Sequence, residues 1–82
     1  METKLNQTDT QGRKQGPWEE HYANGNLWYK GSYLNDIEIG IWEWYWINGN
    51  LMYKGSYLDG KETGTWEWYD IEGNLKKVIY HH

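Results

Sequence analysis

Large apolar side chains alternate with smaller or polar ones along the central part of the chain. Bulky residues recur at every second position in residues 42–47 (WEWYWI), and the alternation continues in residues 51–58 (LMYKGSYL). A period of two is typical of a β-strand whose two faces differ. Asn48-Gly49 lies between the two runs, and both residue types tolerate the positive φ of a two-residue type I′ turn. The pattern therefore predicts a β-hairpin.

The hairpin pattern recurs along the chain. Trp18, Trp42 and Trp66 are spaced 24 residues apart, and the Asn-Gly turn and the Tyr-Lys-Gly-Ser-Tyr-Leu run recur at the same offset. A fixed period in the twenties, with glycines and aromatics at constant places, indicates a repeat array. No segment has helical periodicity.

We therefore predict an all-β fold, a single-layer antiparallel meander of about six strands built from three β-hairpin repeats. The repeat domain is expected over residues 12–80. Residues 1–11 are expected to be a flexible segment, and residues 81–82 a tail. The polar N-terminus gives no reason to expect a signal peptide, and no run is long enough to span a bilayer.

Turn lengths predict which residues lie side by side across the sheet. We expect two residues in each Asn-Gly turn and four in the loops at 35–38 and 59–62. One row is then Trp18, Gly31, Trp42, Gly55 and Trp66. A second row on the same face is Glu20, Tyr29, Trp44, Tyr53 and Trp68. A row on the opposite face is Glu19, Lys30, Glu43, Lys54 and Glu67.

Each row is physically reasonable. A tryptophan beside a glycine covers exposed backbone, and a lysine between two carboxylates forms favourable cross-strand pairs. One face is then rich in Trp and Tyr, while no helix is expected to cover it. Because a sheet buries its apolar face against something, we expect this sheet to curl on itself or to bind another molecule.

Composition excludes several classes of function. The chain has seven tryptophans and eight tyrosines in 82 residues, and its net charge is −4. That charge argues against direct nucleic-acid binding and against an anionic membrane surface. The chain has no cysteine, so we expect no disulfide and no Cys-based metal site, in keeping with a cytoplasmic location.

Residues 53–69, followed by Gly73-Asn74-Leu75, resemble the MORN-repeat variant family. Its scheme is Tyr-x-Gly-x-aromatic, a Gly-containing turn, Gly-x-Trp-x-x-Tyr and then Asn-Gly, and the likeness runs from about Gly12 to Leu75. The resemblance implies β-hairpins in an elongated sheet and no catalytic residues. Bacterial members are often labelled antitoxins, and other MORN proteins act as scaffolds and dimerise. Asp36 departs from the scheme where Gly60 follows it, and residues 77–79 also depart, which makes the last strand a candidate cap.

The aromatic residues are the candidate binding site. The predicted partner-binding residues are Trp18, Tyr29, Trp42, Trp44, Trp46, Tyr53, Trp66 and Trp68. Three roles stay open for them: the sheet's own core, a contact with a protein, or a platform for sugars or quaternary ammonium groups.

Other candidate chemistry is weaker. Glu19, Glu43 and Glu67 are carboxylates, but a lysine lies between neighbours in the predicted row, so a solvated ladder is expected rather than an acid–base pair. His21, His81 and His82 have no metal-ligand spacing. We expect no cofactor, no metal and no catalytic residue.

The most consistent function is therefore a non-enzymatic, cytoplasmic protein-binding module. Its acidity fits a basic partner, such as a toxin or nuclease that it masks as an antitoxin, or as an inhibitor encoded by a phage against host defence. A homodimer is a further possible occupant of the aromatic face. The alternatives are a carbohydrate- or choline-binding repeat module and a self-assembling structural repeat protein.

Overall fold

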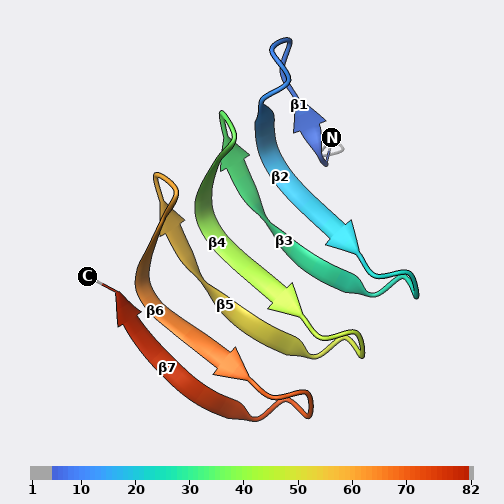
Figure 1. The fold of residues 1–82 in the computed structure, drawn as a ribbon, viewed down its shortest axis with the longest axis vertical. Helices are drawn as coiled ribbons and strands as arrows, with labels where there is room; N and C mark the ends of the chain where they lie inside the picture. The colour runs from blue at the N-terminus through green and yellow to red at the C-terminus, as the bar shows by residue number, and fades with distance from the viewer. Residues whose placement is uncertain (1–4, 82) are drawn as a thin grey trace, which may run out of the picture.

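Antiparallel strands lie side by side in chain order in the computed structural model, which describes residues 5–81 (Figure 1). The seven strands are β1 (Gln7–Thr8), β2 (Lys14–His21), β3 (Leu27–Leu34), β4 (Ile37–Tyr45), β5 (Leu51–Leu58), β6 (Lys61–Tyr69) and β7 (Leu75–His81). Each strand pairs with its neighbour in the chain, and residues 5–81 contain no helix. The predicted single-layer all-β meander is confirmed.

The two ends of the chain are more ordered than the sequence predicted. Strand β1 lies inside the segment expected to be flexible and adds a seventh strand to the six expected. Strand β7 extends through His81, where the tail was expected to begin. Within these two segments, residues 1–4 and His82 lie outside the described residues.

The predicted register is correct in the middle of each strand. Trp42 pairs with Gly55, Glu43 with Lys54 and Trp44 with Tyr53 across β4 and β5. The next hairpin pairs Lys54 with Glu67 and Tyr53 with Trp68. The central rows of the two faces are therefore as expected, because strand alternation carries this register to the neighbouring positions. The register shift between Glu20 and His21 takes Trp28 out of this alternation, and its ring lies 5.0 Å from the Tyr29 ring rather than on the charged face.

The type I′ turn expected at Asn48-Gly49 is wrong. Residues 46–50 connect β4 and β5, and among them only Gly49 has a positive φ, at 94°. The Gly49 N–H donates to the Trp46 carbonyl at 2.9 Å, and the Asn48 side chain accepts the Asn50 N–H at 2.9 Å. Asn48 thus stabilises the loop through its amide rather than through a left-handed backbone. The register shifts by one at the strand end, where Tyr45 pairs with Leu51.

The loops expected at 35–38 and 59–62 are shorter than predicted. Asn35 and Asp36 have φ values of 52° and 68°, and Asp59 and Gly60 have 50° and 81°. Two central residues with positive φ form a type I′ turn, so β3–β4 and β5–β6 are the tight hairpins. Asp36 replaces the turn glycine at a steric cost, which two hydrogen bonds to the Lys14 backbone offset, at 2.7 and 3.0 Å.

The register shift that follows these tight turns falls opposite Gly31 and Gly55. Lys30 pairs with Glu43 but Ser32 pairs with Ile39, so residues 40–42 face Gly31 alone. The same shift in the next hairpin leaves residues 64–66 facing Gly55. A bulge of this kind bends the strand locally, and it brings each central tryptophan over the preceding glycine.

Asparagine side chains connect successive hairpins at one end of the sheet. The amides of Asn24 and Asn26 both donate to the Ile47 carbonyl, at 3.0 and 2.8 Å. Asn48 and Asn50 repeat the arrangement on the Ile71 carbonyl, at 2.9 and 2.8 Å. The Asn-Gly-Asn sequence therefore connects each hairpin to the next one in the sheet, in addition to forming the turn.

Asn6 covers the free edge of β2. Its side-chain amide donates to the Glu19 carbonyl and accepts the Glu19 N–H, both at 2.8 Å. The side chain thus satisfies the two backbone groups as a neighbouring strand would. Covering an edge in this way prevents it from pairing with another sheet.

Candidate functional site

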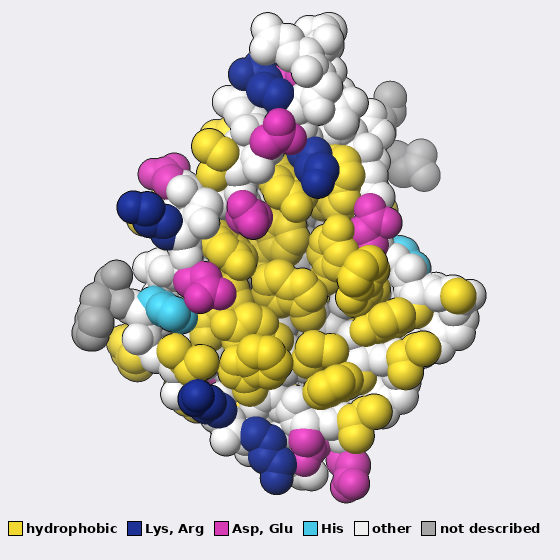
Figure 2. Space-filling model, in the orientation of Figure 1, with side chains coloured by type: hydrophobic (Ala, Val, Ile, Leu, Met, Phe, Trp, Pro, Cys, Tyr) yellow, Lys and Arg dark blue, Asp and Glu magenta, His cyan; other side chains and the backbone are white. Residues whose placement is uncertain are grey.

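Nine aromatic side chains gather on one face of the sheet, which we call the aromatic face. They are Trp18, Tyr29, Tyr33, Trp42, Trp44, Tyr53, Tyr57, Trp66 and Trp68. Figure 2 shows hydrophobic side chains covering the middle of this face, with charged side chains mainly around its border. Residues 5–81 provide no second layer over it.

The central tryptophans of the three repeats form the core of the sheet. Trp18, Trp42 and Trp66 are only 8%, 2% and 0% exposed. A Cβ built on Gly31 would lie 2.1 Å from the Trp42 ring, and one built on Gly55 would lie 2.0 Å from the Trp66 ring. Trp42 and Trp66 therefore cover the backbone of the preceding strand, and all three indoles are core residues rather than accessible ones.

A second row of aromatics remains partly accessible. Tyr29, Trp44 and Tyr53 are half-buried, and Trp68 is 37% exposed. The Tyr53 and Trp68 rings stack at 4.1 Å between centroids, and the Trp42 and Trp44 rings stack at 5.8 Å. The stacking fixes the rings in place, so this row presents a rigid apolar surface.

Trp46 lies apart from the two rows. It follows the last residue of β4, and its indole N–H donates to the Tyr69 carbonyl at 3.2 Å. Tyr22, at the equivalent place in the first repeat, donates its hydroxyl to the Tyr45 carbonyl at 2.5 Å. The structure thus gives Trp46 a role in joining adjacent hairpins.

A third row was missed by the sequence analysis. Tyr33 and Tyr57 lie edge-on to the central tryptophans, with centroid distances of 5.0 Å from Tyr33 to Trp42 and 5.2 Å from Tyr57 to Trp66. His81 takes the same place in the last repeat, 6.2 Å from Trp66. The spacing of 24 residues from Tyr33 to Tyr57 to His81 was the available signal.

Charged side chains border this third row at the turn end of the sheet. Glu38 pairs with Tyr33 across β3 and β4, and Glu62 pairs with Tyr57 across β5 and β6. The Glu62 carboxylate accepts the Tyr53 hydroxyl at 3.3 Å and lies 3.3 Å from His81 Nε2. Lys14 lies over the Trp18 and Tyr33 rings, 5.2 and 5.0 Å from their centroids.

The phenols of the aromatic face titrate above their usual range. Burial, followed by the nearby Glu62 carboxylate, raises the pKa of Tyr53 to about 12. Burial and then the charges of Glu62 and Glu38 also raise the pKa of Tyr57. Both directions are those expected when an ionised phenol would lose water and meet negative charge.

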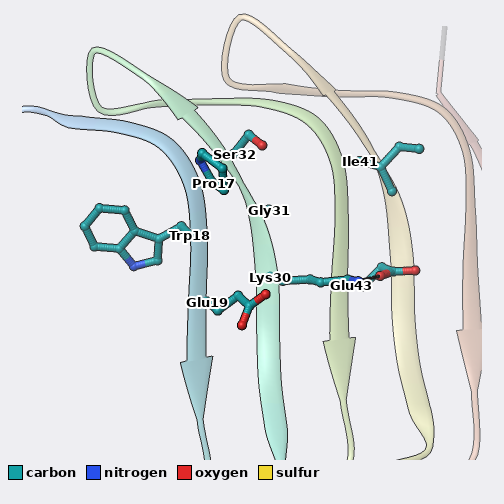
Figure 3. Close-up of a pocket in the computed structure, with 8 residues that line it drawn as sticks. All are labelled: Pro17, Trp18, Glu19, Lys30, Gly31, Ser32, Ile41 and Glu43. Atoms are coloured by element: carbon teal, nitrogen blue, oxygen red, sulfur yellow. Dashed lines mark ion pairs between the residues drawn. The ribbon is translucent and has the colours of Figure 1, made fainter. Parts of the chain in front are cut away.

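The opposite face carries the predicted charge row. Glu19 lies across from Lys30, and Lys30 lies across from Glu43. The Lys30 ammonium and the Glu43 carboxylate are 3.3 Å apart. This ion pair borders a shallow hollow of about 390 Å³ between β2 and β4, and the Trp18 indole points away from it (Figure 3). The carboxylates of the row are separated by lysines, as predicted, so they form a partly solvated ladder.

The described residues provide little for metal or membrane chemistry. No group of three His, Cys, Asp or Glu side chains within residues 5–81 is arranged to hold a metal ion. His21 lies on β2 and His81 on β7, with four strands between them. The same part of the chain contains no helix with the length and apolar character to cross a membrane.

Comparison with known families identifies the repeat. The profile of the MORN repeat variant family matches residues 14–35 and 38–59, together more than half of the chain. The chain therefore belongs to the MORN repeat variant family, as the sequence resemblance indicated, and is a MORN repeat module. The third repeat lies outside the matched ranges. No curated protein and no solved structure matches the chain.

Proposed function

We propose that this MORN repeat module is a non-enzymatic binding protein whose aromatic face covers a basic protein partner. More specifically, we propose that it masks this partner as an antitoxin does, or as an inhibitor encoded by a phage does. The partner-binding residues of this proposal are Tyr29, Trp44, Tyr53 and Trp68. Trp18, Trp42 and Trp66 support them from below.

The observation that carries the proposal is the accessible row of aromatics on a sheet that has one layer. Trp68 is 37% exposed although its ring stacks on Tyr53 at 4.1 Å. Large aromatic side chains are enriched at protein–protein interfaces, and contiguous exposed apolar patches mark interaction sites. A rigid surface loses little conformational entropy when a partner covers it.

The charge of the chain supports a basic partner. The net charge is −4, and acidic side chains such as Glu38 and Glu62 lie on the same face as the aromatic row. Complementary charge steers association and disfavours acidic competitors. The absence of cysteine fits a reducing compartment, and we place the proposed action in the cytoplasm.

A matched pair of variants tests the proposal. Trp68 on the aromatic face is 37% exposed, and Ile41 is 65% exposed and lines the hollow beside Lys30 and Glu43 on the opposite face. We expect Trp68→Ala to weaken capture of a partner from lysate of the source organism at least tenfold, because aromatic anchors carry much of the binding energy. Ile41→Ala should leave capture unchanged.

The alternatives give different results in the same experiment. Capture lost with Ile41→Ala but retained with Trp68→Ala would contradict the proposal. A face occupied by a second copy would appear as concentration-dependent dimers that Trp68→Ala abolishes. A fluorescence change with glucans, in the absence of any captured protein, would favour the carbohydrate-binding alternative. Circular dichroism of both variants checks that the sheet is retained.

A further inference from the structure

One cation on the aromatic face is supplied by the chain itself. Lys14 Nζ lies 5.2 Å from the Trp18 centroid and 5.0 Å from the Tyr33 centroid. An ammonium group over two aromatic rings is held by cation–π attraction, worth about 0.5–1 kcal/mol where water has access. The first repeat thus shows that the corner between an indole and a phenol on this face accommodates a cation.

The second repeat has the same corner with the opposite charge. Trp42 and Tyr57 follow Trp18 and Tyr33 by 24 residues, and Glu38 follows Lys14 by the same interval. Their rings keep the edge-on arrangement, with 5.9 Å between centroids compared with 5.5 Å in the first repeat. The position that holds a lysine in one repeat therefore holds a carboxylate in the next.

The Glu38 carboxylate has no cation of its own. It is half-buried, and no hydrogen bond or ion pair joins its side chain to another residue among 5–81. It lies directly across from Tyr33, and its charge contributes to raising the pKa of both Tyr33 and Tyr57. A half-buried carboxylate beside electron-rich rings forms a site of negative potential.

The third repeat differs from the second. Glu62 takes the equivalent place, but its carboxylate already accepts the Tyr53 hydroxyl and lies 3.3 Å from His81. Of the three corners, the first holds Lys14 and the third holds a carboxylate with two neighbours. The middle corner combines the Trp42 and Tyr57 rings with a carboxylate that forms no ion pair among residues 5–81, while Lys14 remains over the Tyr33 ring.

We propose that the corner formed by Glu38, Trp42 and Tyr57 receives an arginine or lysine side chain of the protein partner. This inference rests on the proposed function and names the chemistry of the partner at one point of the aromatic face. The incoming cation pairs with the Glu38 carboxylate and lies against the Tyr57 ring and the edge of Trp42. An arginine fits best, because its planar guanidinium can pair with a carboxylate and stack on an aromatic ring at the same time.

The direct test uses short peptides as probes. The probes are acetyl-Gly-Arg-Gly-amide, its lysine analogue, its citrulline analogue and choline, each titrated into the full chain while amide and indole resonances are followed. We expect the arginine and lysine peptides to shift the Trp42 indole and Glu38 amide signals in a saturable way. Citrulline has the shape of arginine without its charge, so the citrulline peptide should bind at least tenfold more weakly.

Variants of the two faces complete the test. Glu38→Gln keeps the shape and removes the charge, and should weaken the arginine peptide at least fivefold. Glu43→Gln, on the opposite face, should change nothing. Glu38→Lys should abolish binding while the chain stays folded, because the new ammonium would occupy the corner as Lys14 does in the first repeat.

The results separate this inference from the function on which it rests. Equal binding of the citrulline peptide, or full binding by Glu38→Gln, would overturn the proposed cation site. If choline binds more tightly than the arginine peptide, the proposal of a protein side chain at this site is overturned, and the ligand is a small quaternary ammonium compound instead. If partner capture is lost with Trp68→Ala but unaffected by Glu38→Gln, the protein-binding function stands and the cation site fails.

Discussion

A tryptophan lies flat on a strand only where the neighbouring strand has no side chain. Trp66 is fully buried because Gly55 leaves its ring against bare backbone, and Trp42 covers Gly31 in the same way. The glycine weakens its strand intrinsically, and the indole offsets this by excluding water from the backbone. At the scale of the residue, the contact that defines the repeat is therefore the packing of one indole on one glycine.

Gly55→Ala should therefore destabilise the fold strongly. The new Cβ would lie 2.0 Å from the Trp66 ring, which has no free space in which to move. Overpacking of this kind costs about 1–3 kcal/mol, which is a large share of the stability of a small domain. Urea unfolding followed by tryptophan fluorescence measures it. Thr65, an exposed residue of β6, provides the control: the unfolding free energy of Thr65→Ala should stay within about 0.5 kcal/mol of that of the parent.

The glycine–tryptophan contact was predictable from residue types and spacing alone. Trp18, Trp42 and Trp66 share one phase of the repeat, and Gly31 and Gly55 fall beside them in the expected register. The roles of Tyr33, Tyr57 and His81 were not predicted. Each pairs with a glycine two positions before a central tryptophan, namely Gly16, Gly40 and Gly64. Residue alternation gives the face on which such a side chain lies but not the ring against which it packs.

Turns show where sequence patterns fail at the scale of the element. Asn48-Gly49 has the residues of a type I′ turn, yet Asn48 donates its amide to the Ile71 carbonyl and accepts the Asn50 N–H. These two bonds compete with the left-handed backbone that the dipeptide prefers in isolation. The tight turn forms instead at Asn35-Asp36, where the Lys14 backbone supports the strained residue. The Asn48-Gly49 geometry recurs at the edge of the sheet, where Gly73 has a φ of 97° and donates to the Asp70 carbonyl at 3.0 Å, so that loop conformation is local. Only the Asn35-Asp36 turn is supported by its neighbour.

Asn50→Ala should remove a hydrogen bond between adjacent hairpins and thereby lower the stability of the fold. The Asn50 amide donates to the Ile71 carbonyl at 2.8 Å, and its loss should cost about 0.5–1.5 kcal/mol. Asn74 is the matched control, since it takes the same place in the last repeat and its side chain contacts only Asp70, at 3.3 Å, within its own turn. Equal effects of Asn50→Ala and Asn74→Ala on thermal unfolding would contradict the role of the asparagine ladder.

The whole molecule is an array with different ends. Asn6 covers the β2 edge, and at the other end Ile79 stands opposite Trp66, where Gly31 and Gly55 stand opposite Trp18 and Trp42. A tryptophan of a further repeat would meet the Ile79 side chain instead of bare backbone. Addition of another repeat at this edge is therefore sterically disfavoured, in keeping with the proposal that binding uses the aromatic face.

High pH should unfold the array through its tyrosines. Burial raises the pKa of Tyr45 and Tyr53 from 10.0 to about 12, with Glu43 and Glu62 adding to the effect. A folded pKa above the unfolded one means that the stabilisation is complete below about pH 10 and is lost as the pH rises through about 12. Urea midpoints measured between neutral pH and pH 11 should fall above pH 10. Tyr53→Phe should reduce the fall, and a constant midpoint would contradict the assignment.

Hydroxyl-radical footprinting of the free chain and of the chain bound to its captured partner tests the central claim most directly. Tyr53 and Tyr69 are both half-buried and report on the two faces, since Tyr53 stacks on Trp68 whereas the Tyr69 hydroxyl donates to Glu67 of the charge row. The account predicts that oxidation of Trp68, Trp44 and Tyr53 falls on binding while oxidation of Tyr69 stays constant. Protection of Tyr69 with no change at Trp68 would contradict it.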